Sequence, residues 1–324
     1  MKSSTHPFPA PPPPEELMAE IRAQSGQPVA RELQPLTDQA LRRFGAAVEG
    51  VLFYGSCLRS GKPTEGVVDL YVLVDSYTHA FPRRLLRWAN ACLPPNVFML
   101  HASAADGQVL RAKCAVLSLA HFEQGTGQWF QSYLWGRFAQ PSRLVFSRNA
   151  EVRERIHRAL AQAVVMLHRR TLPAMPDRFT ADEFWRRALS LSYATELRPE
   201  AAGRPDELVQ HDASGYRRLS ATVAPALTEM VLLGDNLYGN RLPTAARQRG
   251  MRQWRWRRLQ GRTLNVARLM KSVLTFENGV DYVVWKLERH TGEKIEVSPR
   301  LRRYPLIFGW PLLWRVLRGG GPRQ

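Results

Sequence analysis

The sequence has few cysteines, few acidic residues and no long hydrophobic run. Its three cysteines, Cys57, Cys92 and Cys114, show no metal-ligand spacing and leave an odd thiol, which indicates a reducing compartment and no structural zinc. The eight histidines are scattered, and none lies at ligand spacing from another His, Cys or Glu, so we expect no His-based metal site. No apolar run approaches the roughly 20 residues that cross a bilayer. We therefore do not expect an integral membrane protein.

The N-terminal residues lack both the apolar core of a secretory signal and the Arg-rich pattern of a mitochondrial presequence. Prolines occupy positions 7, 9 and 11–14, and a chain of that composition is extended and flexible. We expect residues 1–34 to form a flexible Pro-rich tail with a short helix near residues 15–23.

Acidic residues are scarce: 28 Asp and Glu stand against 46 Lys and Arg, a formal net charge of +18. From residue 251 to 324 the chain has 16 basic and 5 acidic residues, a net +11. An excess of this size favours an anionic partner or environment. Both nucleic acid and anionic lipid remain open at this point.

The most informative pattern is an apolar strand that runs into Tyr54-Gly55-Ser56 and is followed by a second strand carrying Asp69. This layout is typical of a nucleotidyltransferase site. Backbone N–H groups at Gly55 and Ser56 can hold triphosphate oxygens, and a carboxylate on the neighbouring strand can hold a divalent cation that bridges the phosphates. Apolar neighbours make Asp69 an expensive place for an unpartnered charge.

The second carboxylate of this layout is missing, because Tyr71 occupies the position two residues beyond Asp69. Asp75 has the right parity but lies about 20 Å farther along an extended strand, so it cannot share one ion with Asp69. Another acidic ligand would come from elsewhere. Glu65, Asp106 and Glu196 are the candidates.

The remaining patterns predict an α+β protein with a nucleotidyltransferase-type mixed sheet flanked by helices. Apolar periodicity predicts helices at residues 38–44, 83–93, 151–167 and 180–197 and strands at 96–101 and 109–119. Thr180 and Glu183 form a capping-box pattern. Residues 216–242 are predicted to be helical. Lys113, inside a strand, is either an edge-strand charge or a phosphate ligand.

The C-terminal part combines apolar, aromatic and basic residues. From residue 259 to 287 an apolar stripe predicts a long helix. The preceding stretch 254–258 alternates Trp and Arg, which suits a lipid interface or stacked nucleobases. Residues 306–317 are too few to span a bilayer but suit its headgroup level. The membrane-binding candidates are Arg302, Arg303, Phe308, Trp310, Trp314 and Arg315.

Five blocks in order resemble the mitochondrial-type phosphatidate cytidylyltransferases, also called translocator assembly and maintenance proteins. Tyr54-Gly55-Ser56 resembles the Tyr-Gly-Ser-Gly block of that family, although Cys57 stands where the family has Gly. Residues 68–75 resemble its Leu-Asp-Phe-x-Phe-x-Val-Asp strand, in which the second position after Asp is also apolar or aromatic. The other blocks are residues 111–118, 133–141 and 191–198, with a weaker echo at 267–287.

The resemblance implies a nucleotidyltransferase domain over residues 35–150, a helical winged-helix-like domain over 151–245, and a basic C-terminal amphipathic helix with a membrane-contacting segment over 246–324. It implies transfer of CMP from CTP to phosphatidic acid with Mg²⁺, at the inner face of the cell membrane in the cytoplasm. Asp69 and Lys113 would be catalytic, and Asp69 and Glu196 would bind the metal. Nucleotide contacts would come from Tyr54, Gly55, Ser56, Arg137, Tyr193 and Arg198.

Two alternatives stay open. The basic charge and the Trp/Arg stretch at 254–258 fit an RNA-binding nucleotidyltransferase-like protein, although the resemblance makes a nucleic-acid partner less favoured. The missing second carboxylate fits an inactive scaffold of the same fold.

Overall fold

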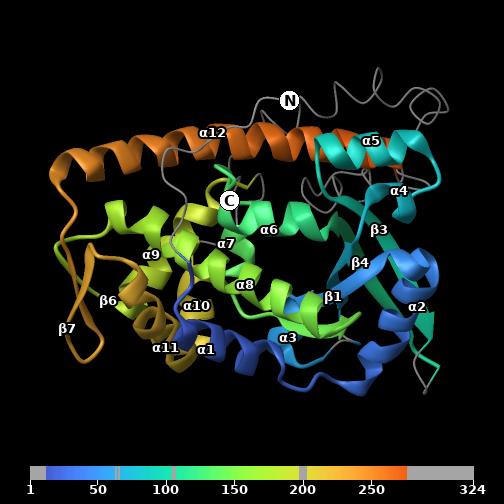
Figure 1. Ribbon diagram of the computed structural model, residues 1–324, viewed down its shortest axis with the longest axis horizontal. Helices are drawn as coiled ribbons and strands as arrows, with labels where there is room; N and C mark the ends of the chain where they lie inside the picture. Colours follow the sequence, from blue (N-terminus) through green and yellow to red (C-terminus); the bar gives the residue numbers. More distant parts are fainter. Residues whose placement is uncertain (1–11, 63, 65, 104–106, 197–202, 276–324) are drawn as a thin grey trace, which may run out of the picture.

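The computed structural model describes residues 12–62, 64, 66–103, 107–196 and 203–275. A mixed sheet lies at one end of the molecule, helices and a small second sheet lie at the other, and one long helix runs along both (Figure 1). The predicted α+β class is confirmed. The predicted domain boundaries stay predictions.

The mixed sheet has the strand order β3-β4-β2-β1-β5. Its strands are β1 (Val48–Tyr54), β2 (Val67–Val74), β3 (Asn96–Ser103), β4 (Val109–Ser118) and β5 (Arg143–Ser147). The β2 and β4 strands are parallel, and the other neighbours are antiparallel. A parallel pair needs a crossover, and here α4 (Tyr77–Ala80), α5 (Arg84–Cys92) and β3 supply it.

Both faces of the sheet are buried. Successive side chains of a strand point to opposite faces, so each strand contributes to two hydrophobic clusters. On one face Val68, Leu70 and Val72 pack with α2 (Gln34–Phe44). On the other face Tyr71 and Leu73 join a larger cluster with α6 (Leu119–Gly127), α7 (Trp135–Phe138) and α8 (Ala150–Thr171). These strands are therefore apolar on both sides, and a polar residue within them needs a specific partner.

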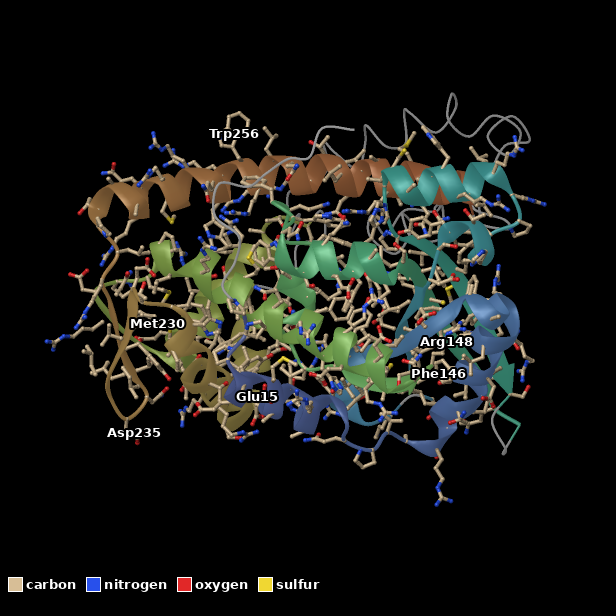
Figure 2. The ribbon with its side chains drawn as sticks, in the orientation of Figure 1. Glu15, Phe146, Arg148, Met230, Asp235 and Trp256 are labelled. Carbon is tan, nitrogen blue, oxygen red and sulfur yellow. The ribbon has the colours of Figure 1, made fainter. Side chains whose placement is uncertain are left out.

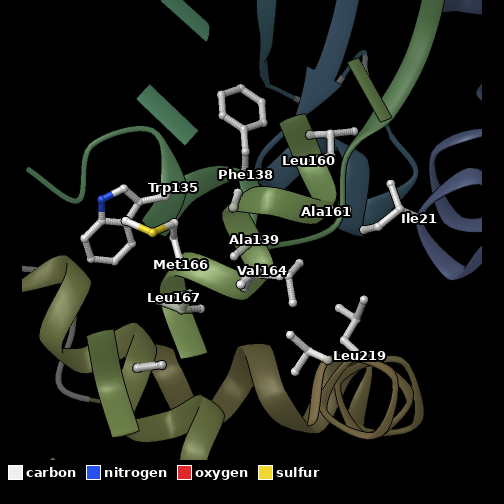
Figure 3. Close-up of a cluster of buried hydrophobic side chains, with 14 of the residues drawn as sticks. Ile21, Trp135, Phe138, Ala139, Leu160, Ala161, Val164, Met166, Leu167 and Leu219 are labelled. Atoms are coloured by element: carbon white, nitrogen blue, oxygen red, sulfur yellow. The ribbon is translucent and has the colours of Figure 1, made fainter. Parts of the chain in front are cut away.

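The larger cluster is continuous from the sheet to the helical part. Figure 3 shows Trp135, Phe138, Leu160 and Val164 gathered with Ile21 of α1 (Glu15–Ser25) and Leu219 of α11 (Ala213–Val223). The short predicted helix near residues 15–23 is thus present, and it packs on α8 and α11.

The helical part contains α9 (Ala181–Tyr193), α10 (Arg204–His211) and a small antiparallel sheet of order β6-β8-β7. Thr180 and Glu183 form the predicted capping box at the start of α9. The prediction of a helix over residues 216–242 is wrong in part: residues 216–223 belong to a helix, but β7 (Met230–Gly234) and β8 (Leu237–Asn240) form a hairpin in the later part. Asn236 adopts φ 56° in its turn, a conformation that Asn tolerates better than most residues.

The last described element, α12 (Thr244–Thr275), begins well before the predicted start at residue 259. The interpretation of residues 254–258 as one surface cluster is wrong in part, because Trp254 and Arg257 are buried and Trp256 is exposed. A helix turns about 100° per residue, so alternating residues cannot all share a face. Among the described residues, no helix is long and apolar enough to cross a membrane.

Candidate active site

Three neighbouring strands place Tyr54, Asp69 and Lys113 in one row. Tyr54 of β1 pairs with Asp69 of β2, and Asp69 pairs with Lys113 of β4. Residues in register on adjacent strands point to the same face, here the face of the larger hydrophobic cluster. Asp69 and Lys113, the two residues predicted to be catalytic, are therefore neighbours in space, although they are 44 positions apart in the sequence.

The loop after β1 brings the backbone against the Asp69 carboxylate. Gly55 has φ 93° and ψ −158° and leads into the short helix α3 (Ser56–Ser60). A Cβ atom at Gly55 would lie 2.6 Å from Asp69 Oδ2, closer than atoms of these types can approach. Glycine is required at this position both for its backbone conformation and for the room beside the carboxylate.

Cys57, which replaces a glycine of the family pattern, is buried in α3 and donates its thiol to the Val67 carbonyl oxygen at 3.5 Å. Burial and the negative charge of Asp69 raise the pKa of this thiol. The thiol is thus a packed, protonated donor that ties α3 to the start of β2.

Lys113 lies on β4, which has neighbours on both sides in the sheet. This position excludes the edge-strand interpretation of its charge, and the interpretation of Lys113 as a phosphate ligand stays a prediction. Its side chain is partly exposed, and its charge helps to lower the pKa of Tyr133. Lys113 therefore lies close to the next group of site residues.

Arg137 of α7 sits over the same sheet face, and its side chain is 19% exposed. Its guanidinium donates to the Tyr71 hydroxyl oxygen at 3.0 Å and to Glu196 Oε1 at 3.0 Å. It also lies 4.4 Å from the centre of the Tyr133 ring, a cation–π distance. Tyr71, which occupies the position of the missing second carboxylate, thus contacts a cation.

Two of the family-like blocks are packed against each other. A Cβ atom at Gly136 would lie 2.1 Å from Ser192 Oγ, so this glycine lets α7 approach α9 closely. The Tyr193 hydroxyl donates to Gln140 Oε1 at 3.0 Å. These contacts bring Arg137 and Glu196 within ion-pair distance of each other. The hydrogen bond of Tyr193 holds Gln140 next to the end of α9. Arg198, predicted to bind nucleotide, lies outside the described residues.

Arg268 of α12 adds a cation beside Tyr133, and Lys271 follows it on the same helix. Both were missed by the sequence interpretation. The Arg268 guanidinium lies 3.9 Å from the centre of the Tyr133 ring and donates to Gln131 Oε1 at 2.9 Å. Its Nη1 atom is buried without a hydrogen-bond partner. Lys271 donates to the carbonyl oxygens of Leu93 and Pro95. The buried apolar stripe predicted only a packed helix here.

The cations change the ionisation of the tyrosines. Burial raises the pKa of Tyr133, but the charges of Arg137, Arg268 and Lys113 outweigh it and bring the pKa down to about 8. The pKa of Tyr54 is instead raised well above its usual value by burial and by Asp69. The site is therefore strongly electropositive around Tyr133 and negative at Asp69.

Asp69 and Glu196 are the acidic groups of the site, and their number is compatible with a divalent cation that is also coordinated by triphosphate oxygens. Asp69 offers one carboxylate in a space that a side chain at residue 55 would fill, whereas the Glu196 carboxylate is paired with Arg137. Among the residues that the structure describes, no group of three or more His, Cys, Asp or Glu side chains gathers as a metal site. Magnesium commonly uses one or two carboxylates together with substrate phosphates, and this donor set matches that pattern. Glu65 and Asp106 lie outside the described residues.

The predicted membrane-binding residues Arg302, Arg303, Phe308, Trp310, Trp314 and Arg315 also lie outside the described part of the chain. Their role stays a prediction.

Comparison with known protein families matches residues 78–253 to the family described as phosphatidate cytidylyltransferase, mitochondrial. A solved structure, the nucleotidyltransferase-like protein from Exiguobacterium sibiricum, is 10% identical over 90% of this chain and 92% of its own, with a TM-score of 0.24. No curated protein matches. The family match includes Lys113, Tyr133, Arg137 and Glu196 and begins after Asp69. Because this match covers more than half of the 324 residues, the chain belongs to the mitochondrial phosphatidate cytidylyltransferase family.

Proposed function

We propose that this chain transfers CMP from CTP to phosphatidic acid, forming CDP-diacylglycerol and releasing pyrophosphate. The observation that carries the proposal is the row of Tyr54, Asp69 and Lys113 on adjacent strands, covered by Arg137. The family match supports the same reaction. Both substrates are polyanions, and a carboxylate beside several cations is the arrangement that phosphoryl-group chemistry uses.

In the proposed reaction an oxygen of the phosphatidate phosphate attacks the α-phosphorus of CTP. The bond from that phosphorus to the oxygen bridging to the β-phosphate breaks, and pyrophosphate leaves with the bonding electrons. A phosphate monoester, with a second pKa of about 6, is already largely ionised at neutral pH. The site therefore needs no strong general base, and positioning and charge neutralisation provide the catalysis.

Each residue has a role in this proposal. The backbone at Gly55 and the Ser56 hydroxyl hold triphosphate oxygens, and Tyr54 packs beneath them against Arg137, whose guanidinium carbon lies 5.7 Å from the Tyr54 ring centre. Lys113 and Arg137 neutralise phosphate charge. Tyr193 holds the segment after α7 through its hydrogen bond to Gln140 and, with Arg198, stays a proposed nucleotide contact.

Asp69 would hold Mg²⁺ together with the triphosphate oxygens, and the ion would neutralise charge on the departing pyrophosphate. Glu196 stays a proposed second ligand. Its ion pair with Arg137 at 3.0 Å supports a positioning role as well, because that pair fixes the guanidinium toward Tyr71.

Membrane association at the cytoplasmic face of the cell membrane belongs to the same proposal, since phosphatidic acid is a bilayer lipid. The basic, tryptophan-bearing sequence at 302–315 supports it, because Trp and Arg favour the headgroup region of an anionic leaflet.

The test is transfer of radiolabelled nucleotide to phosphatidate in detergent micelles, run with each of the four ribonucleoside triphosphates and Mg²⁺. We expect a lipid-soluble product with CTP, loss of that product in Asp69→Ala, and an increased KM for CTP in Lys113→Ala. No product with any triphosphate, or normal turnover by Asp69→Ala, would overturn the proposal. Labelling of an oligoribonucleotide instead would favour the RNA alternative.

A further inference from the structure

Helix α12 has one face in the protein and one face in solvent. Gly250, Trp254, Arg257 and Gly261 form the buried stripe. Trp254 donates to the Arg170 carbonyl oxygen at 2.8 Å. The opposite face carries exposed residues, which include Arg252, Arg255, Trp256, Arg258, Leu259 and Arg262. Figure 2 shows Trp256 directed outward from α12, away from the body of the protein.

The outer face combines large apolar side chains with charge of one sign. Trp256 is 65% and Leu259 is 59% exposed, and they lie three residues apart on the same side of the helix. The 32 residues of α12 include nine Arg or Lys and no Asp or Glu. A solvated helix face usually carries both signs of charge and few large apolar groups, so this one departs from an ordinary surface.

Helix α5 repeats the same pattern. Leu85 and Trp88 are exposed three residues apart, beside exposed Arg83 and Arg84, and residues 76–103 contain no acidic residue. Among the described residues, Trp88 and Trp256 are the two exposed tryptophans. Both exposed tryptophans thus belong to helices with basic residues and no acidic neighbours in sequence.

The two helices lie along the same side of the molecule (Figure 1). Arg268 donates to the Pro94 carbonyl oxygen at 2.9 Å and Lys271 to the Pro95 carbonyl oxygen at 2.7 Å, which ties the C-terminal part of α12 to the segment after α5. We call the exposed residues Arg83, Arg84, Leu85, Trp88, Arg252, Arg255, Trp256, Arg258, Leu259 and Arg262 the α5–α12 face.

We propose that the α5–α12 face binds the surface of an anionic phospholipid bilayer. Tryptophan partitions to the headgroup level, aliphatic side chains enter the acyl boundary, and arginine is attracted to anionic lipids. Leu85 and Leu259 favour lipid over nucleic acid, because aliphatic side chains at these positions offer no stacking surface for bases. A second copy of the same face is disfavoured because like charges would oppose each other.

The role of the α5–α12 face in presenting a lipid substrate rests on the proposed function. Arg268, on the inner side of α12, reaches Tyr133 in the candidate site, and Trp256 lies twelve residues earlier, about 18 Å along the helix axis. One helix would therefore contact the bilayer outside and a substrate phosphate inside. A lipid acceptor would then need to leave the bilayer by only a short distance to reach the site.

The test reads the environment of residue 256 directly in the full chain. Cys92 is exposed, whereas Cys57 and Cys114 are buried, so Cys92→Ser gives a background in which an introduced thiol can be labelled. Trp256→Cys and Leu232→Cys would each carry an environment-sensitive fluorophore. Leu232, 58% exposed on β7, is the matched control in the hairpin that Figure 2 marks with Met230 and Asp235.

We expect the label at 256 to shift to shorter wavelength with phosphatidylcholine vesicles containing phosphatidate or phosphatidylserine, with no shift at 232. No shift at 256, equal shifts at both positions, a shift that depends on protein concentration without lipid, or a shift with single-stranded RNA and none with vesicles would each overturn the proposal.

A second measurement is vesicle partitioning of Arg255→Gln/Arg258→Gln. Removal of two charges near an anionic surface should weaken partitioning about thirtyfold, which corresponds to about 1 kcal/mol per charge. The same charge loss on α8, Arg153→Gln/Arg158→Gln, should leave partitioning within about threefold of wild type. Equal losses in the two variants would show that net charge alone drives binding and would overturn the assignment of this face.

These readouts separate the two proposals. Transfer in detergent micelles with no fluorescence shift at 256 would remove the α5–α12 face and keep the proposed reaction. A shift at 256 in a chain that transfers no nucleotide would keep the face and remove the reaction.

Discussion

Gly55→Ala should remove activity by moving Asp69, with a separate and measurable cost in stability. The added Cβ would lie 2.6 Å from Asp69 Oδ2. Because a carboxylate at the end of a short side chain can rotate, the protein is expected to relieve this contact by turning Asp69 away from the loop. The substitution therefore acts first on the proposed metal ligand, because the three heavy atoms nearest to the added Cβ all belong to Asp69.

The stability cost comes from the backbone. Gly55 has φ 93° and ψ −158°, a region that residues with a side chain occupy at a cost of about 1–3 kcal/mol. For a domain of this size the corresponding fall in Tm is roughly 2–4 °C per kcal/mol. Gly45→Ala is the matched control, because Gly45 has φ 54° and ψ −134° and its added Cβ would meet nothing within 4 Å.

Thermal unfolding and CTP-dependent transfer to phosphatidate, assayed well below both Tm values, separate the two effects. Both variants should lose Tm to a similar extent. Gly55→Ala alone should lose turnover, on the order of a hundredfold, the scale of a displacement of about 1 Å in a catalytic site. If Gly55→Ala matches the turnover of Gly45→Ala, the placement of Asp69 beneath Gly55 has no role in catalysis and the reasoning fails.

Two further predictions concern pH. Near-ultraviolet phenolate absorbance should show one tyrosine with a pKa of about 8, since cations outweigh burial at Tyr133. Tyr133→Phe should remove this titration, and Arg268→Ala should raise its pKa. An unchanged titration in both variants would contradict the assignment. Burial lowers the pKa of His168 from 6.5 to about 3. Between these two pH values His168 is protonated in the unfolded chain and neutral in the folded chain. Stability should therefore fall by about 1.4 kcal/mol per pH unit as pH drops from 6.5 toward 3. Denaturant titrations at several pH values give the free energy of unfolding as a function of pH. This free energy should depend less steeply on pH in His168→Gln than in the wild type, and an equal dependence would refute this account.

The strands β1 to β4 and the Gly-Ser loop could be predicted from the sequence because their signals are local, whereas β5 and β6 were not predicted. Residues 67–74 are rich in β-branched and aromatic residues, and Thr180 with Glu183 marks a helix start by spacing alone. The hairpin at residues 230–240 was missed, although Gly234, Asp235 and Asn236 carry a recognisable turn pattern. The apolar residues around that turn fit a helix and a pair of short strands equally well.

The composition of the site could be predicted only in part, because its members come together through long-range register. Alignment of Asp69 with Lys113 depends on a parallel pairing that no local pattern specifies. Arg268 reaches Tyr133 from 135 residues away, and its sequence neighbourhood predicts only a packed helix. The place of a buried cation such as Arg268 in the site can be recognised only from its contacts in the folded structure.

The absent second carboxylate takes on a physical meaning in this arrangement. Tyr71, two residues beyond Asp69 on the same sheet face, accepts a hydrogen bond from Arg137 at 3.0 Å. Arg137 already pairs with the Glu196 carboxylate. A second carboxylate at residue 71 would further reduce the positive charge available to a substrate, whereas a neutral phenol fixes Arg137 without adding negative charge. Under the proposed function, Arg137, Arg268 and Lys113 would supply the positive charge that a second metal ion supplies in two-metal sites. Under the proposed function, this substitution suits a site that must hold two phosphorylated substrates at once.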